Sequence, residues 1–269
     1  MTAREKLEKK FDKNFHICVG LDTDINKIPK HLLSETDPVL AFNKIIIEST
    51  AEFAACYKIN FAFYERFGAK GFAALAQTLE LIPKDILVIA DAKRGDIGNT
   101  SEMYAKAVFD ELKFDSITLH PYMGFDSLQP FLDYKEKLNF ILALTSNKGA
   151  VDFEKQKLEN GKFLFQQVIE KASQWNENKN CGIVFGATKI DELKENISSF
   201  GDLVVLLPGV GAQGGSLEDV AATFNQHKNK NYLVNISRAL LYCDGSEEFN
   251  KHVTELIKSY NQSVFNLSN

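Results

Sequence analysis

The segment ILVIADAKRGD (86–96) decides the fold that we expect for this chain. The run 86–90 is apolar throughout, and Asp91, Lys93 and Asp96 follow it directly. A short run that is apolar on both faces is typical of a strand in a parallel sheet that is covered on both sides. In a closed barrel of such strands, functional side chains lie at the carboxyl ends. The segment therefore predicts a buried parallel strand that ends in a site.

Runs similar to ILVIADA (86–92) recur along the whole chain with helical patterns between them. They are HICVGLD (16–22), ACYKINF (55–61), SITLH (116–120), FILALT (140–145), CGIVFGA (181–187), LVVLLPG (203–209) and YLVNIS (232–237). Strand and helix alternating eight times predict an α/β fold, a (β/α)8 TIM barrel. We expect residues 1–269 to form this single domain, because such barrels are typically about 250 residues long. An open doubly wound sheet is the alternative.

Several side chains predict where helices begin and end. Pro83 is expected to end the helix after the second strand, and Thr100 or Ser101 to cap the third helix. Ser216 is expected to cap the seventh. The segments 22–37 and 146–160 are long and follow strands, so both are candidate lids, although the Lys- and Glu-rich part, 152–160, is more typical of a solvated insertion.

Composition excludes several classes of protein. Apolar residues make up 45%, charged residues 25%, and the net charge is −5, so no general basic field predicts a nucleic-acid partner. No run approaches the roughly 18 apolar residues of a membrane span, and the charged segment 1–15 is not a secretory signal. The four cysteines are far apart, which indicates neither a zinc site nor a redox pair. A cytoplasmic protein is expected.

Charged residues at two strand ends form the first candidate site. Asp91 and Lys93 are two residues apart, so they share one face of their strand. Lys58 lies at the corresponding end of the neighbouring strand, and Asp96 lies on the loop after the third. Together they predict an array of alternating charge, with an ion pair that merely closes the barrel mouth as the alternative.

A glycine-rich segment forms the second candidate site. PGVGAQGG (208–215) follows the seventh strand, and Arg238 follows the eighth. Glycine lets backbone N–H groups approach an anion, and the loops after strands seven and eight are a recurrent phosphate site in these barrels. An arginine adds a forked, permanently charged donor. The two features predict a phosphomonoester substrate.

These motifs together resemble the orotidine 5′-phosphate decarboxylase family. The matching segments are VGLD (19–22), YKIN (57–60), DAKRGD (91–96), LTSN (144–147), PGVGAQGG (208–215) and SRAL (237–240). The form DAKRGDIGNTS (91–101) resembles the longer bacterial, type 2 branch. The resemblance implies that orotidine 5′-monophosphate is converted to UMP and CO2 in de novo pyrimidine biosynthesis, with neither a metal nor an organic cofactor.

The resemblance also implies roles for individual residues. Lys93 donates a proton to C6, Asp91 lies against the substrate carboxylate, and Lys58 holds Asp91 and a ribose hydroxyl. Asp96 completes the array and reaches the site of a second copy, which implies a homodimer with shared sites. The residues that the resemblance assigns to substrate binding are Asp22, Asn60, Thr100, Ser146, Pro208, Gly211, Gln213 and Arg238.

Two other functions remain open on this sequence. A Mg2+-dependent sugar-phosphate decarboxylase or synthase of the same superfamily shares the Asp-x-Lys-x-x-Asp motif, but it has a carboxylate where this chain has Lys58. A catalytically inactive nucleotide-binding barrel is the other alternative, although it has no need of the charged array. His120, at the end of the fourth strand, is expected behind the site rather than in it.

Overall fold

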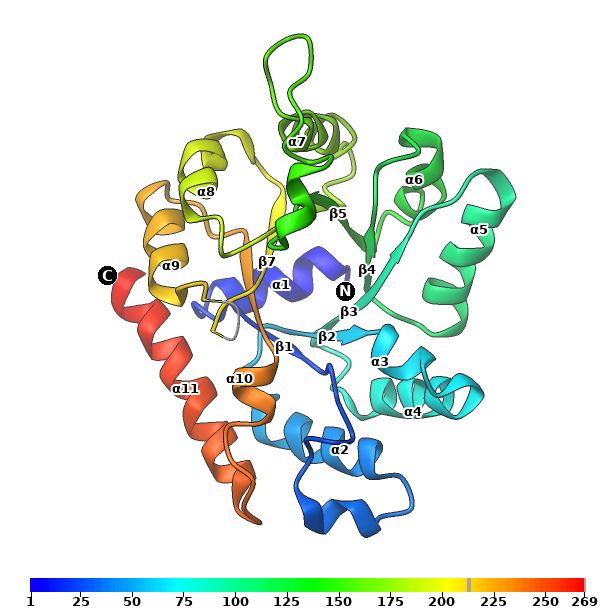
Figure 1. The fold of residues 1–269 in the computed structure, drawn as a ribbon, viewed down its shortest axis with the longest axis vertical. Helices are drawn as coiled ribbons and strands as arrows, with labels where there is room; N and C mark the ends of the chain where they lie inside the picture. The colour runs from blue at the N-terminus through cyan, green and yellow to red at the C-terminus, as the bar shows by residue number, and fades with distance from the viewer. Residues whose placement is uncertain (212–213, 269) are drawn as a thin grey trace.

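A closed barrel of eight parallel strands forms the centre of the computed structural model, which describes residues 1–211 and 214–268 (Figure 1). The ring closes where β1 pairs with β8, with Cys18 opposite Asn235. Each predicted run overlaps one strand, so the predicted barrel is confirmed, although β3 ends later and β5 begins earlier than predicted. The strands are β1 (Ile17–Gly20), β2 (Cys56–Asn60), β3 (Leu87–Arg94), β4 (Ser116–Leu119), β5 (Leu138–Leu144), β6 (Cys181–Phe185), β7 (Val204–Pro208) and β8 (Tyr232–Ile236).

Helices surround the barrel and bury its outer face. Large apolar side chains, among them Phe42, Phe165 and Phe224, are fully buried between the two layers. The helices after β1 are α2 (Pro38–Thr50), α3 (Ala62–Glu65), α4 (Gly68–Leu81), α5 (Gly98–Lys106), α6 (Phe125–Leu132), α7 (Leu164–Gln174), α8 (Ile190–Asn196), α9 (Leu217–Gln226), α10 (Arg238–Leu241) and α11 (Phe249–Ser268). Short helical turns lie at η1 (Lys30–Ser34), η2 (Ala107–Glu111), η3 (Lys148–Val151) and η4 (Ile197–Ser199). None of the helices in the described ranges is both long and apolar enough to cross a bilayer.

Two of the three predicted helix limits are confirmed. Helix α4 ends at Leu81, ahead of Pro83, and the hydroxyl of Ser216 accepts a hydrogen bond from the N–H of Asp219 at the start of α9. The predicted cap at Thr100 or Ser101 is wrong, because α5 already begins at Gly98. Ser101 is buried, and its hydroxyl donates to the carbonyl of Ser127 in α6. It joins two helices instead of capping one.

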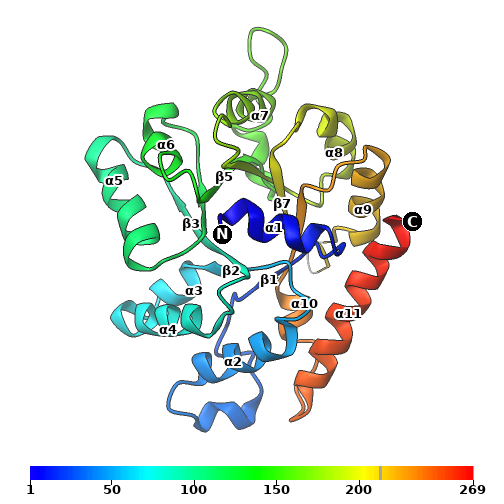
Figure 2. The same ribbon diagram turned by 180° about the vertical axis from the view of Figure 1, so that it is seen from behind.

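A helix that the sequence analysis did not predict, α1 (Ala3–Phe11), closes the end of the barrel at which the strands begin (Figure 2). Leu7 and Phe11 lie four residues apart on one face and are buried among side chains of the barrel interior. The N–H of Ala3 donates to the carbonyl of Glu136, just before β5, at 2.8 Å. Helix α1 therefore closes the barrel at the end where the strands begin, and the open end is the one at which the strands finish.

Strand β3 is irregular where it reaches that open end. Ala90 pairs with Ile117 and Arg94 with Leu119, so four steps along β3 correspond to two along β4. Lys93 lies inside this bulge with a left-handed backbone, φ +46°. Bulges re-aim side chains next to active sites. Here the bulge carries a residue that the sequence predicts to be functional.

Candidate active site

A cavity of about 340 Å³ opens at the carboxyl ends of the strands. This is the face on which barrels of this architecture place their active sites, and the volume is in the range of a small-molecule site. Every strand, or the loop after it, contributes to its lining. The predicted site residues that line it are Asp22, Lys58, Asn60, Asp91, Lys93, Ser146, Pro208 and Arg238.

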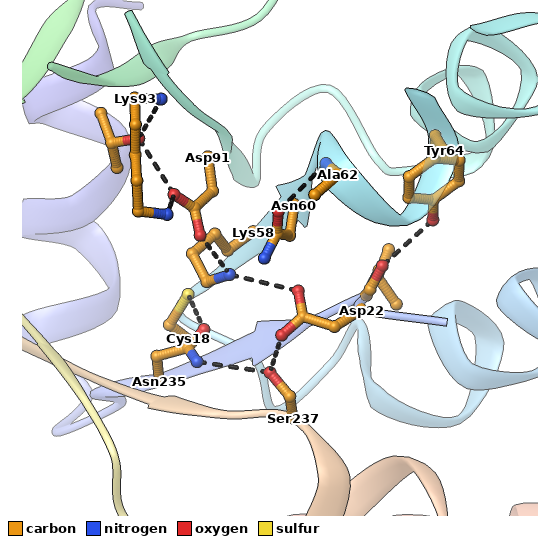
Figure 3. A network of polar contacts seen from close by, with 12 residues as sticks. Cys18, Asp22, Lys58, Asn60, Ala62, Tyr64, Asp91, Lys93, Asn235 and Ser237 are labelled. Carbon is orange, nitrogen blue, oxygen red and sulfur yellow. Dashed lines mark hydrogen bonds and ion pairs between the residues drawn. The ribbon is translucent and has the colours of Figure 1, made fainter. Parts of the chain in front are cut away.

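Four charged side chains form a chain of ion pairs across the floor of this cavity (Figure 3). Lys93 Nζ lies 2.6 Å from Asp91 Oδ1, and Lys58 Nζ lies 2.9 Å from Asp91 Oδ2. Lys58 Nζ also lies 3.2 Å from Asp22 Oδ1. We refer to Lys93, Asp91, Lys58 and Asp22 as the charge array. Its signs alternate, as predicted, and its fourth member within this chain is Asp22.

The array holds its central groups in the charged state. Burial alone would lower the pKa of Lys58, but the carboxylates of Asp22 and Asp91 outweigh burial and raise it. Burial would raise the pKa of Asp91, but the ammonium groups of Lys58 and Lys93 hold it well below its usual range. The Lys58 side chain is 5% exposed, whereas that of Lys93 is 50% exposed. Lys93 is therefore the most exposed member of the array.

Ser237 anchors the end of the array at Asp22. Its hydroxyl donates to Asp22 Oδ2 at 2.8 Å and accepts from Asn235 Nδ2 at 3.3 Å. A Cβ at Gly20 would lie 1.9 Å from the Ser237 oxygen, so only glycine leaves room for this contact. The sequence analysis quoted Ser237 within a motif without assigning it a role. The sequence carries no signal for this contact, because only the pairing of β1 with β8 in the closed barrel brings Gly20 and Ser237 together.

Ser146 begins segment 146–160, and Glu154 of the same segment holds the neighbouring Thr145 in place. The carboxylate of Glu154 accepts hydrogen bonds from the N–H of Thr145 at 2.7 Å and from its hydroxyl at 2.8 Å. Lys155 forms an ion pair with Glu192 in α8. Most of 152–160 is exposed, as expected of a solvated insertion, but Glu154 and Lys155 are half-buried and contact Thr145 and α8.

The glycine-rich segment and Arg238 lie at one side of the cavity. Pro208 and Gly209 line it together with Arg238, the first residue of α10. Gly209 has φ +106°, a conformation that favours glycine, and its carbonyl accepts from the N–H of Gly215 at 3.1 Å. Gly211 is exposed and does not line the cavity. Gln213, which the resemblance assigns to the same loop, lies outside the described residues.

Two further predicted site residues, besides Gly211, lie outside the cavity of this chain. Asp96 is half-buried, and its carboxylate accepts from the N–H of Ile97 at 2.8 Å. Thr100 is exposed on α5. Neither lines the cavity. The role predicted for them depends on a second copy of the chain and stays a prediction.

His120 lies behind the site. A Cβ at Gly95 would lie 2.8 Å from Cε1 of the His120 ring, so the ring packs directly on the backbone between Arg94 and Asp96. The N–H of His120 donates to the carbonyl of Arg94 at 3.1 Å. Arg94 is fixed in turn by Glu65, 2.6 Å away. His120 and Glu65 therefore hold the turn 94–96 in place beside the site.

Known proteins share both this barrel and these motifs. A model of the orotidine 5′-phosphate decarboxylase / HUMPS family matches residues 16–248. The chain belongs to this family. It is 48% identical to the orotidine 5′-phosphate decarboxylase of Porphyromonas gingivalis over 252 residues, which cover 93% of this chain and 91% of that protein. It is 50% identical to that of Christiangramia forsetii over 253 residues, which cover 93% and 92%.

Solved structures of family members have the same fold. The OMP decarboxylase of Leishmania donovani superposes with a TM-score of 0.82 at 35% identity, covering 97% of this chain and all of that one. The UMP synthase of the same organism gives a TM-score of 0.85 at 37% identity and covers 98% of this chain. This chain spans 57% of that longer protein. The resemblance read from the motifs is confirmed.

Proposed function

We propose that this protein is an orotidine 5′-phosphate decarboxylase, which converts orotidine 5′-monophosphate to UMP and CO2 in pyrimidine biosynthesis. The observation that carries the proposal is the charge array at the mouth of a closed barrel, beside a glycine-rich loop and Arg238. The bond between C6 and the carboxyl carbon breaks, its electron pair stays on C6, and a proton from Lys93 takes the place of CO2.

Lys93 is suited to stabilise the charge that develops at C6. The electron pair left on C6 lies in the plane of the ring, so the ring's π-system does not delocalise it. Positive charge that is already in place at that atom is then the strongest available stabiliser. Asp91 holds the Lys93 ammonium at 2.6 Å, while half of the Lys93 side chain is exposed. The ammonium is thus both fixed and accessible, and it is the proton donor in our mechanism.

Asp91 favours the loss of CO2 by raising the free energy of the bound substrate, whereas Lys93 stabilises the carbanion. Because its pKa is held low, it remains a carboxylate when the substrate's own carboxylate arrives beside it. Two like charges at short range repel each other. Departure of CO2 removes one of them, so the repulsion is relieved as the C–C bond breaks.

Groups remote from C6 bind the rest of the nucleotide. In this proposal Asp22, Asn60 and Lys58 hold the ribose and Ser146 contacts the pyrimidine edge. Arg238, Pro208 and the loop with Gly211 and Gln213 bind the phosphate. Such distant contacts lower the barrier when their binding free energy holds the reacting carboxylate against Asp91. Arg238 at the helix start of α10 is placed for a charge-assisted hydrogen bond to phosphate.

Lys58 favours this reaction over the Mg2+-dependent alternative. Its ammonium lies between the carboxylates of Asp22 and Asp91, where a divalent cation would have to be coordinated. In the described parts of the chain, no group of three or more His, Cys, Asp or Glu residues is placed to hold a metal ion. A positive charge supplied by the protein itself serves the same electrostatic purpose.

The decisive experiment measures the loss of orotidine 5′-monophosphate absorbance with purified protein and EDTA. We expect conversion to UMP at an undiminished rate. Lys93→Ala is expected to be folded, with unchanged circular dichroism, and to show no measurable turnover. Activity that disappears with EDTA and returns with Mg2+ would instead support the sugar-phosphate enzymes, and an active Lys93→Ala variant would remove Lys93 from its role.

We further propose a homodimer in which Asp96 and Thr100 complete the partner's site. Exposed apolar side chains lie at the start and in the middle of α5 and near the start of α6, two helices that pack together: Ile97 (59% exposed), Met103 (51%), Tyr122 (82%) and Phe125 (42%). Apolar patches of this kind mark protein interfaces. The patch borders Asp96 and includes the helix that carries Thr100.

Co-expression of two inactive variants tests this dimer. Asp96→Asn and Lys93→Ala are each expected to be inactive as homodimers. In a random mixture half of the dimers are mixed, and each mixed dimer has one intact site, so about a quarter of the wild-type activity is expected to return. No recovery, or an active Asp96→Asn homodimer, would contradict a shared site.

A further inference from the structure

Thr118 lies directly beneath the charge array without belonging to it. It is the third residue of β4, it is 1% exposed, and it lines the cavity. Its hydroxyl oxygen lies 3.0 Å from the N–H nitrogen of Lys93 and 3.0 Å from Asp91 Oδ1. One buried hydroxyl therefore contacts both residues on which the proposed proton transfer depends.

The chemistry of the groups fixes the direction of both hydrogen bonds. A backbone N–H can only donate, so the Thr118 oxygen accepts from Lys93. The hydroxyl has a single proton, which then remains for the Asp91 carboxylate. Asp91 Oδ1 receives this hydrogen bond in addition to that of Lys93 Nζ at 2.6 Å, while Oδ2 receives that of Lys58 at 2.9 Å. Thr118 is thus the uncharged donor among the three that orient this carboxylate.

The bulge in β3 explains why Lys93 needs this contact. Lys93 lies between the paired residues Ala90 and Arg94, outside the regular ladder, and its φ is +46°. A left-handed backbone costs a residue other than glycine roughly 1–2 kcal/mol, so it persists only where the surroundings hold it. The hydroxyl of Thr118 takes the place of the strand carbonyl that a regular ladder would offer to the Lys93 N–H.

We propose that Thr118 is a positioning residue for decarboxylation. Its hydroxyl holds the Lys93 backbone and the Asp91 carboxylate in fixed positions relative to each other. The inference rests on the proposed function. It predicts an effect on the chemical step and little effect on nucleotide binding, since the hydrogen bonds of Thr118 go to Lys93 and Asp91 and not to the groups that we assign to ribose and phosphate.

Three variants test the proposal. Thr118→Val keeps the shape of the side chain and removes the hydroxyl, whereas Thr118→Ser keeps the hydroxyl. Ser116→Ala is the matched control, because Ser116 is two residues earlier on β4, and its buried hydroxyl has no hydrogen-bond partner among the described residues. For each variant kcat and KM, the dissociation constant for UMP and the Tm are measured on folded protein.

We expect kcat of Thr118→Val to fall by roughly 10- to 100-fold, because small misplacements of reacting groups have effects of this size. KM and the UMP dissociation constant should stay within about 3-fold of the wild type, as for an interaction used only in the chemical step. Thr118→Ser should recover most of kcat, and Ser116→Ala should match the wild type. A role confined to stability would lower the Tm without changing kcat per folded enzyme.

Specific outcomes would overturn the proposal. A wild-type kcat in Thr118→Val would do so, and so would a loss of UMP affinity as large as the loss of kcat. If Thr118→Val does not fold, Thr118→Ala is compared with Thr118→Ser by the same criteria. A wild-type protein that does not decarboxylate orotidine 5′-monophosphate would refute the proposed function instead, so the two failures are distinguishable.

Discussion

Replacing Lys58 by methionine should destabilise the barrel as well as inactivate it. The ammonium of Lys58 lies 2.9 Å from Asp91 and 3.2 Å from Asp22, and its side chain is 5% exposed. At an effective dielectric constant near 20, each contact corresponds to about 5 kcal/mol of attraction before desolvation. Lys58→Met has a similar length but leaves the carboxylates of Asp91 (9% exposed) and Asp22 (16% exposed) without the ammonium between them. Removing one partner from a buried ion pair typically costs about 3–5 kcal/mol, and we expect a loss in that range.

The loss of unfolding free energy in Lys58→Met should depend on pH. The depressed pKa of Asp91 stabilises the wild type above the unfolded-state pKa near 3.9, and this contribution is lost as the pH falls below that value. In Lys58→Met the carboxylates repel each other while both are charged, and protonation relieves the repulsion. The difference in unfolding free energy between the two proteins should therefore be full at neutral pH and shrink below about pH 4.

Urea unfolding followed by circular dichroism measures this difference at neutral and acidic pH. A loss of this size should also lower the Tm by roughly 10 °C in a barrel of this length. Lys44→Met is the matched control, since Lys44 makes only an exposed contact of 3.9 Å with Glu48, and it should behave like the wild type. A Lys58→Met protein as stable as the wild type at neutral pH, or a difference that grows on acidification, would refute the reasoning.

Three further predictions concern the rim of the site. Arg238→Ala should weaken UMP binding and raise KM while leaving slow turnover, and wild-type kinetics in a steady-state assay would contradict its phosphate role. Glu154→Ala should lose the contacts with Thr145 and reduce kcat/KM by roughly 10-fold, whereas Glu154→Gln, which retains an acceptor oxygen, should lose less; equal losses in the two variants would show that the hydrogen bond does not matter. Gly95→Ala should destabilise the protein by about 1–3 kcal/mol through collision with His120, and the double variant with His120→Ala should recover part of this in a thermal unfolding cycle; strict additivity would contradict the contact.

The strands were predictable because a parallel barrel buries both faces of each strand, which leaves apolar runs that stand out from their surroundings. The prediction ended β3 too early, at residue 92, because Lys93 and Arg94 are charged and a search for apolar runs does not include them. The strand continues to Arg94, and its ladder with β4 is irregular there. Helix α1 was missed because its exposed face is highly charged. The Thr2–Glu5 capping box and the spacing of Leu7 and Phe11 were signals for it.

The charged part of the site was predictable for a different reason. Carboxyl ends of neighbouring strands meet at one rim, so Lys58, Asp91 and Lys93 had to lie close together once the barrel was assumed. Ser237 and Thr118 escaped notice because serine and threonine are common in strands. Their roles come from a close approach at Gly20 and from a bulge, and neither feature has a sequence signature of its own.

Helix α1 closes the barrel at the end where the strands begin, so among the described residues the cavity opens at the carboxyl ends of the strands. Leu7 and Phe11 fill its lower end, so nucleotide, CO2 and protons share the route past the half-exposed Lys93. Lys93 can then take up a new proton from bulk water between turnovers without a relay through the protein. Turnover in D2O should accordingly place deuterium at C6 of UMP, and each departing CO2 must clear the same passage that the nucleotide uses.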